Sequence, residues 1–194
     1  MIIVFIGPPG AGKGTQAALL SQKLQIPCFS MGQLLREAYE EKTPEGVEAW
    51  DNYLTKGINV PIGLKFKILR DQMDRAKTGF ILDNYPRTND DLEALKGYLN
   101  STGKKIDRVF HLIIADETCF LRIQKRADNA RVKRKDDDLV LLRTRIEEGY
   151  RKELPEILEY FQQQGNLVEI DGTQSIKDVL RQINKFFTAG KFKL

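Results

Sequence analysis

The residues best suited to chemistry lie near the start of the chain, in the stretch GPPGAGKGT. Its four glycines allow sharp turns and close approach to a ligand, and successive N–H groups at the start of a helix supply positive potential for phosphates. Lys13 adds a mobile charge, and the spacing matches the phosphate-binding pattern G-x-x-x-x-G-K. We therefore predict a phosphate loop formed by Gly10, Ala11, Gly12, Lys13, Gly14 and Thr15.

The loop departs from that pattern at one position. The residue after the lysine, which usually places a hydroxyl on Mg²⁺, is Gly14, and the hydroxyl comes one residue later at Thr15. A bound Mg²⁺ should then depend on water, the nucleotide and a carboxylate elsewhere. We predict that Asp83, at the end of the short apolar stretch GFILD, supplies that carboxylate, to the metal or to its waters.

Several arginines are candidate phosphate ligands. Arg87 follows Asp83 closely in NYPRT, and Arg36 lies in the segment SMGQLLR. Arg122 and Arg126 are four residues apart and so share one face of a predicted helix. Each of them could instead be a solvated surface charge.

The elements that must position these residues follow from the apolar pattern. Five apolar stretches predict buried strands, at 2–6, 28–29, 79–83, 109–114 and 167–170. Helical patterns separate them. Helices are expected over 14–24, 90–99, 156–163 and 175–187, with short helices over 44–76. A further helix is expected to start at Asp116, and another to end around 153–155. This alternation predicts an α/β fold with a parallel sheet.

Composition limits the classes of protein. A length of 194 residues with 41% hydrophobic residues suits one compact domain with inserted subdomains. The net charge of +4 mixes basic residues with 27 acidic ones, which favours a small polyanionic ligand over nucleic acid. No stretch predicts a membrane span or a leader, so we expect a cytoplasmic protein. Cys28, Cys119 and His111 have no metal-ligand spacing and are expected to be structural.

Over nearly its whole length the chain resembles the adenylate kinase branch of the nucleoside monophosphate kinases. The motifs that carry the resemblance occur in order along the chain. They are GPPGAGKGT, SMGQLLR, GFILDNYPRT, the helix with Arg122 and Arg126, RKDD at 134–137, Arg145 eleven residues after Arg134, and VEIDGT.

The resemblance implies a doubly wound five-stranded parallel sheet in a single P-loop kinase domain over 1–194. The core would comprise 1–30, 61–126 and 139–194, with a monophosphate-binding insert at 31–60 and a short lid at 127–138. The implied reaction is reversible phosphoryl transfer from Mg-ATP to a nucleoside monophosphate, with Mg²⁺ and ATP, no structural zinc and a monomeric protein. Small-molecule nucleotides are the expected partners.

The resemblance also implies roles for individual residues. Lys13 would follow the transferred group, and Arg36 and Arg87 would hold the acceptor phosphate. The arginines that would close over the nucleotides are Arg122, Arg126, Arg134 and Arg145. Of these, Arg122 would stack on the adenine of ATP. Asp136 and Asp137 would fix the lid arginines or join the water network of the metal. The acceptor site would comprise Met31, Arg36, Val60, Asn84, Arg87, Asp91, Arg134 and Arg145.

The acceptor side is where the chain departs from the family. Met31 and Gln33 replace a hydroxyl and a carboxylate, Asn84 replaces a glycine, and Asp91 stands where a glutamine reads adenine. Because a carboxylate only accepts hydrogen bonds, Asp91 would favour bases rich in donors, and AMP would then be a poor acceptor. The alternative is that backbone contacts preserve AMP specificity. A catalytically weak or inactive nucleotide sensor is the competing function, while a nucleic-acid-binding module explains only the charge.

Overall fold

One parallel sheet organises the chain in the computed structural model, which describes residues 1–56, 60–129, 146 and 150–188. Its strand order is β2-β3-β1-β4-β5, with every pair parallel. The direction of winding reverses at β1, between β3 and β4, and ligands bind at such a switch point beyond the carboxyl ends of the strands. The five strands are β1 (Ile2–Ile6), β2 (Cys28–Ser30), β3 (Phe80–Asp83), β4 (Arg108–Ile113) and β5 (Leu167–Asp171).

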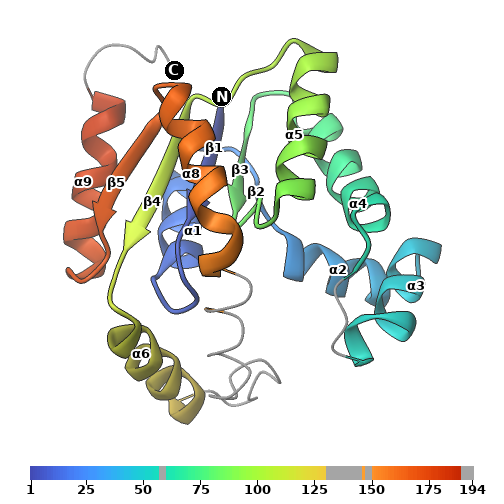
Figure 1. Ribbon diagram of the computed structural model, residues 1–194, viewed down its shortest axis with the longest axis horizontal. Helices are drawn as coiled ribbons and strands as arrows, with labels where there is room; N and C mark the ends of the chain where they lie inside the picture. Colours follow the sequence, from blue (N-terminus) through green and yellow to red (C-terminus); the bar gives the residue numbers. More distant parts are fainter. Residues whose placement is uncertain (57–59, 130–145, 147–149, 189–194) are drawn as a thin grey trace.

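Helices cover both faces of this sheet (Figure 1), which confirms the predicted doubly wound α/β architecture. Most begin or end within a few residues of the positions predicted from the sequence. They are α1 (Lys13–Leu24), α2 (Met31–Glu40), α3 (Pro44–Asn52), the 3₁₀ turn η1 (Leu54–Lys56), α4 (Ile62–Arg75), α5 (Asn89–Thr102), α6 (Asp116–Asn129), α8 (Lys152–Gln163) and α9 (Ile176–Thr188).

The unbroken apolar sequence of β1 reflects its burial on both faces. Ile2, Val4 and Ile6 pack with residues of α4, α5 and α8, whereas Ile3 and Phe5 pack with residues of α1 and α9. Because alternate side chains of a strand point to opposite faces, a strand between two helical layers must be apolar at every position. The central strand is therefore held rigidly where the phosphate loop begins.

Helices α2 and α3 extend to one side of the sheet, as Figure 1 shows. They approach closely at Gly46, where a Cβ atom would lie 2.2 Å from the backbone of Ala38. Leu35, Ala49 and Val60 form a small apolar cluster of their own in this region. The expected insert at 31–60 contains α2, α3 and η1; of the expected lid, 127–129 end α6 and 130–138 lie outside the described residues.

One predicted boundary is wrong. The sequence predicted that a helix ends around 153–155, because proline interrupts helices. Instead, α8 begins at Lys152 and runs through Pro155 to Gln163. Pro155 is the fourth residue of α8, so the carbonyl four residues earlier belongs to Arg151, in the π-helical turn of residues 150 and 151 that leads into the helix. The proline therefore removes no hydrogen bond between two residues of α8.

Candidate active site

The phosphate loop connects β1 to α1. Gly10 and Gly12 have φ angles of +85° and +92°, which favour glycine, and a Cβ atom at Gly10 would lie 2.8 Å from the carbonyl oxygen of Cys119. Gly12 is the N-cap of α1, with no side chain to cap the helix and no acidic residue in its first turn. The first N–H groups of α1 are therefore left without a side-chain acceptor, as an anion-binding helix start requires.

Lys13 lies at the first position of α1 and is only 7% exposed. Its Nζ donates a hydrogen bond to the carbonyl oxygen of Pro8 at 2.9 Å, so the side chain folds back over the loop. It also lines the large cleft beside the loop. An ammonium group held in this way can contact a phosphate bound by the loop N–H groups.

Asp83 ends β3 directly beside β1, because Phe5 and Asp83 are paired in the sheet. Its Oδ1 is buried and has no hydrogen-bond partner among the described residues. Burial raises the pKa of this carboxyl, and the charge of Lys13 opposes the rise. Mg²⁺ prefers oxygen ligands and keeps several waters, so a carboxylate with one unpartnered oxygen beside the phosphate loop fits its requirements.

Gly14 makes room for this carboxylate. A Cβ atom at Gly14 would lie 3.2 Å from Asp83 Oδ2, closer than nearly all natural contacts. The glycine that replaces the usual hydroxyl residue therefore lets Asp83 lie against the start of α1. The structure thus places the departure at Gly14 and the predicted carboxylate side by side.

A cleft of about 610 Å³ brings most of the predicted site residues together. It is bounded by the phosphate loop, α1, α2, α6 and the ends of β2 and β3. Four basic residues from four segments converge on it, together with one carboxylate. The predicted residues that line it are Gly10, Gly12, Lys13, Gly14, Thr15, Met31, Arg36, Asp83, Asn84, Arg87 and Arg126.

Four other predicted residues within the described part of the chain do not line this cleft: Ala11, Val60, Arg122 and Asp91. Ala11 is buried within the phosphate loop, and Val60 packs in the small cluster of Leu35 and Ala49. Arg122 donates hydrogen bonds to the carbonyl oxygens of Gly172 and Thr173, at 2.8 and 3.2 Å. These contacts tie α6 to the turn after β5, next to the cleft wall formed by Arg126.

Asp91 has a different position from the one expected. Its carboxylate is 1% exposed and accepts hydrogen bonds from the backbone N–H groups of Arg87 and Thr88, at 3.0 and 3.3 Å. Its Oδ1 lies 2.6 Å from Lys65 Nζ. With Thr88 it forms the capping box of α5. The contacts of the Asp91 carboxylate are therefore those of a helix cap and an ion pair.

The remaining predicted residues, Arg134 and Arg145, lie outside the described residues, as do Asp136 and Asp137. Among the residues the structure does describe, there is no group of three or more side chains suited to holding a metal ion. Within those same residues, no helix combines the length and the apolar character needed to cross a membrane.

Sequence reasoning missed several residues of the cleft wall. Cys28 and Ser30 line it because they belong to β2, whose carboxyl end opens toward the same edge as β3. The position of these residues at the carboxyl end of a predicted parallel strand could have identified them from the sequence. Burial, and less strongly the charge of Asp83, raise the pKa of the Cys28 thiol to about 12, so it stays protonated. The other lining residues that were missed are Pro9, Ala18, Gly32 and Ile123, whereas Gln33, which also lines the cleft, was expected on the acceptor side.

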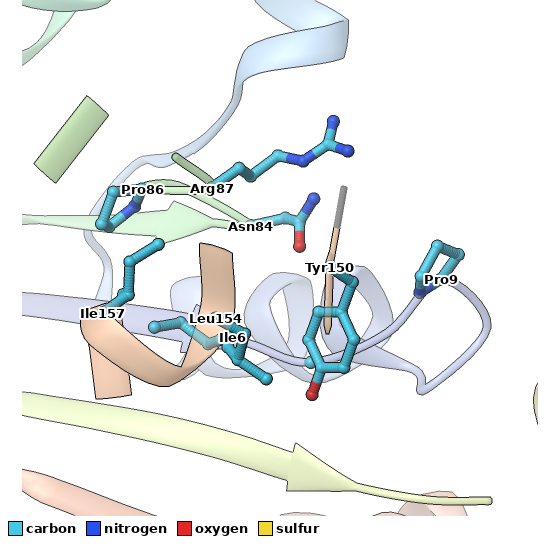
Figure 2. Close-up of a pocket in the computed structure, with 9 residues that line it drawn as sticks. Ile6, Pro9, Asn84, Pro86, Arg87, Tyr150, Leu154 and Ile157 are labelled. Carbon is cyan, nitrogen blue, oxygen red and sulfur yellow. The ribbon is translucent and has the colours of Figure 1, made fainter. Parts of the chain in front are cut away.

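A second, smaller pocket of about 20 Å³ adjoins the loop (Figure 2). Asn84 and Arg87 line both this pocket and the large cleft. Tyr150 closes it from the other side, and the Tyr150 hydroxyl lies 2.8 Å from Nε2 of His111 on β4. His111 is thus a buried strand histidine with a partner, in agreement with its expected structural role.

Comparison with known proteins agrees with this geometry. The family model described as "Adenylate kinase" matches residues 5–166. The chain belongs to the adenylate kinase family. It is 38% identical to the adenylate kinase of Chelativorans sp. strain BNC1 over 189 residues, which cover 94% of this chain and 96% of that protein.

Other adenylate kinases match over similar lengths. Adenylate kinase 1 of Nostoc sp. strain PCC 7120 is 36% identical, with 93% of this chain and 95% of the relative covered. An adenylate kinase of Clostridium botulinum strain Langeland is 33% identical, with 98% and 100% covered. The resemblance therefore extends from the phosphate loop through the described part of the cleft to the last helix.

Proposed function

We propose that this adenylate kinase family member catalyses reversible transfer of the γ-phosphoryl group from Mg-ATP to AMP. The observation that carries the proposal is the convergence of Lys13, Arg36, Arg87 and Arg126 with Asp83 on one cleft at the phosphate loop. ATP binding alone would not need basic residues on α2 and after β3. The relatives are named as adenylate kinases, which agrees with a phosphoryl-transfer enzyme, and nothing favours an inactive sensor.

The arrangement suits phosphoryl transfer because that reaction depends on positioning and charge more than on a strong base. In the proposed complex the loop N–H groups and Lys13 hold the donor phosphates, and Arg36 and Arg87 hold the acceptor phosphate across the cleft. An acceptor phosphate oxygen is already anionic near neutral pH, so no side chain has to remove a proton from it. Arg126 would add charge over the transferring group.

Magnesium fits this site through Asp83, whose buried Oδ1 lacks a partner among the described residues. When bound, Mg²⁺ neutralises part of the charge on the phosphate oxygens. The residues of this chain would hold it through the Asp83 carboxylate and its waters, with Gly14 leaving the space that the carboxylate needs.

AMP is the proposed acceptor because the argument against it rested on Asp91. The carboxylate of Asp91 is engaged by Lys65 and by two backbone N–H groups, so it does not present acceptors to a base. Met31, Gln33 and Asn84 line the cleft and are the remaining side chains of the acceptor side that differ from the family pattern. A methionine is apolar and adaptable, which permits contact with the face of an adenine.

The proposal extends to the parts of the enzyme that would move or assemble. We propose that 31–60 forms the monophosphate-binding insert and 127–138 a short lid, from which Arg134 closes over the nucleotides together with Arg145. Arg122 would lie against the adenine of ATP. The enzyme would act as a monomer in the cytoplasm, without structural zinc.

Steady-state rates with saturating Mg-ATP and AMP, CMP, UMP, GMP or dTMP test the proposed reaction. We expect AMP to give the highest kcat/KM, by at least about tenfold, a discrimination that small differences in a binding site can supply. A different monophosphate in the lead would contradict AMP as the acceptor. ATP binding by calorimetry without turnover on any acceptor would instead support the nucleotide sensor.

The variant Arg87→Ala tests the phosphate site within the same assay. We expect kcat/KM for AMP to fall about 10²- to 10³-fold, the usual cost of removing a charged transition-state contact. Arg75→Ala, at the end of α4 and outside the cleft, is the matched control and should retain wild-type rates. Equal rates for the two variants would remove Arg87 from the reaction.

A further inference from the structure

Asn84 follows Asp83 directly, where the chain leaves β3 and turns toward Arg87. Its φ of +59° lies in the left-handed region, which most residues other than glycine avoid. Its backbone N–H donates to the carbonyl oxygen of Phe5 at 2.9 Å, which anchors the turn to β1. Glycine would satisfy this backbone at lower cost, so the backbone does not account for a side chain here.

Asn84 lines both pockets of the site. It lines the large cleft together with Lys13, Asp83 and Arg87, and it also lines the small pocket closed by Tyr150. Figure 2 shows the carboxamide and the Arg87 guanidinium extending in the same direction from this turn. Within the described residues the carboxamide has no hydrogen-bond partner. A partly exposed amide aimed at a phosphate cleft has both donors available.

The surrounding charges indicate what the amide would bind. Lys13, Asp83 and Arg87 line the same cleft as Asn84. In the proposed complex Lys13 would hold the donor phosphates and Arg87 the acceptor phosphate, and an ionised Asp83 carboxylate cannot donate a hydrogen bond. The position between these basic residues is where the transferring phosphoryl group would pass. A neutral donor there adds a hydrogen bond without adding another charge close to the metal site.

We propose that Asn84 is a further catalytic residue, whose Nδ2–H group donates a hydrogen bond to an oxygen of the transferring phosphoryl group. This role rests on the proposed kinase function. In the transfer, the bond from the γ-phosphorus to the bridging oxygen of ADP breaks, and a bond from the same phosphorus to an oxygen of the AMP phosphate forms. Asn84 neither gains nor loses a proton, and its hydrogen bond strengthens as charge develops on the transferring oxygens.

The variant Asn84→Gly is the central test, because glycine adopts the same φ without strain and removes only the side chain. We expect kcat to fall roughly tenfold to hundredfold, with KM for ATP and AMP within about threefold of wild type. Asn84→Asp, of equal size, should lose more, because a carboxylate repels the phosphoryl oxygens and cannot donate to them. Thermal unfolding of both variants should stay within about 4 °C of wild type.

Gln25→Gly is the matched control. Gln25 also carries an amide at a left-handed position, with φ of +55°, but it ends α1 outside the cleft and donates to Gln22. We expect its kcat to equal that of wild type. A kcat for Asn84→Gly within about twofold of wild type, or a raised KM for AMP with unchanged kcat, would overturn the role of Asn84 alone. A wild-type chain inactive with every acceptor would overturn the proposed function, and this role with it.

Discussion

At the scale of single residues, the site depends on small side chains as much as on charged ones. Gly14 lets the Asp83 carboxylate lie against the start of α1, and Gly12 starts that helix without a capping side chain. Lys13 is folded back onto the Pro8 carbonyl. The loop therefore holds one positive charge close to a row of backbone donors, which is the arrangement that binds phosphates.

The variant Lys13→Met tests this arrangement. Methionine keeps an unbranched apolar stem of similar length, so the mostly buried side chain should still pack, and the ammonium alone is lost. We expect kcat to fall about 10²- to 10³-fold, while the unfolding temperature stays close to that of wild type. A coupled kinetic assay measures kcat, and calorimetry on the same preparations measures the unfolding temperature.

Lys23→Met is the control on the same helix. Lys23 lies in the last turn of α1 and donates to Asn184, away from the phosphate loop. Full activity in Lys23→Met with loss in Lys13→Met would locate the effect in the loop. Full activity in both would rule out the role of Lys13 in transfer.

At the scale of elements, the start of α5 holds the turn that carries Arg87. Thr88 and Asp91 form a reciprocal capping box, and the Asp91 carboxylate also accepts from the N–H of Arg87. Lys65 on α4 supplies the opposite charge. The ion pair thus joins α4 to α5 directly beneath a predicted phosphate ligand.

Lys65→Met should destabilise the fold, because it leaves the Asp91 carboxylate buried without its counter-charge. We expect a loss of about 2–3 kcal/mol in the free energy of unfolding, below the cost for a fully buried pair because Lys65 is 17% exposed. Adding Asp91→Asn should recover most of that loss, since an amide oxygen can still accept from the backbone. Urea denaturation of the single and double variants measures both effects.

Lys67→Met provides the comparison for this helix. Lys67 pairs with Glu45 at the surface, so its removal should leave the free energy of unfolding unchanged. If the double variant proved no more stable than Lys65→Met, the ion pair would not be the reason for the loss.

The sequence predicted those parts of the site that strand positions determine. Apolar stretches that end at Gly7 and Asp83 predicted two strands of a parallel sheet, and the carboxyl ends of these strands lie side by side at the cleft. Asp91 shows why other roles escaped prediction. Spacing from Arg87 cannot distinguish a residue that faces the substrate from one that caps α5, although the pattern Thr88-x-x-Asp91 was a visible capping signal. The ion pair with Lys65 depends on tertiary packing alone.

At the scale of the whole molecule, His111 connects the sheet to the segment that enters α8. Its ring lies on β4 with Nε2 2.8 Å from the Tyr150 hydroxyl, while Nδ1 lies 4.0 Å from a Glu169 carboxylate oxygen on β5. Burial lowers the pKa of His111, and Lys13 contributes in the same direction against the opposing effect of Glu169. The folded protein therefore favours the neutral ring.

This lowered pKa predicts how stability depends on pH. Below the unfolded-state pKa of about 6.5, His111 is protonated in the unfolded chain but stays neutral in the folded protein. The free energy of unfolding therefore falls as the pH falls. The contribution is fully present above that value and is lost as the pH falls toward the lower folded-state pKa. His111 is the only histidine of the chain, and histidine is the side chain whose usual pKa lies between pH 5 and pH 8. We therefore assign the pH dependence in this range to His111.

Urea denaturation at about pH 5.5 and pH 7.5 should show wild type less stable at the lower pH, whereas His111→Gln, which is always neutral, should show a smaller difference. An equal difference in the variant would assign the pH dependence to another group.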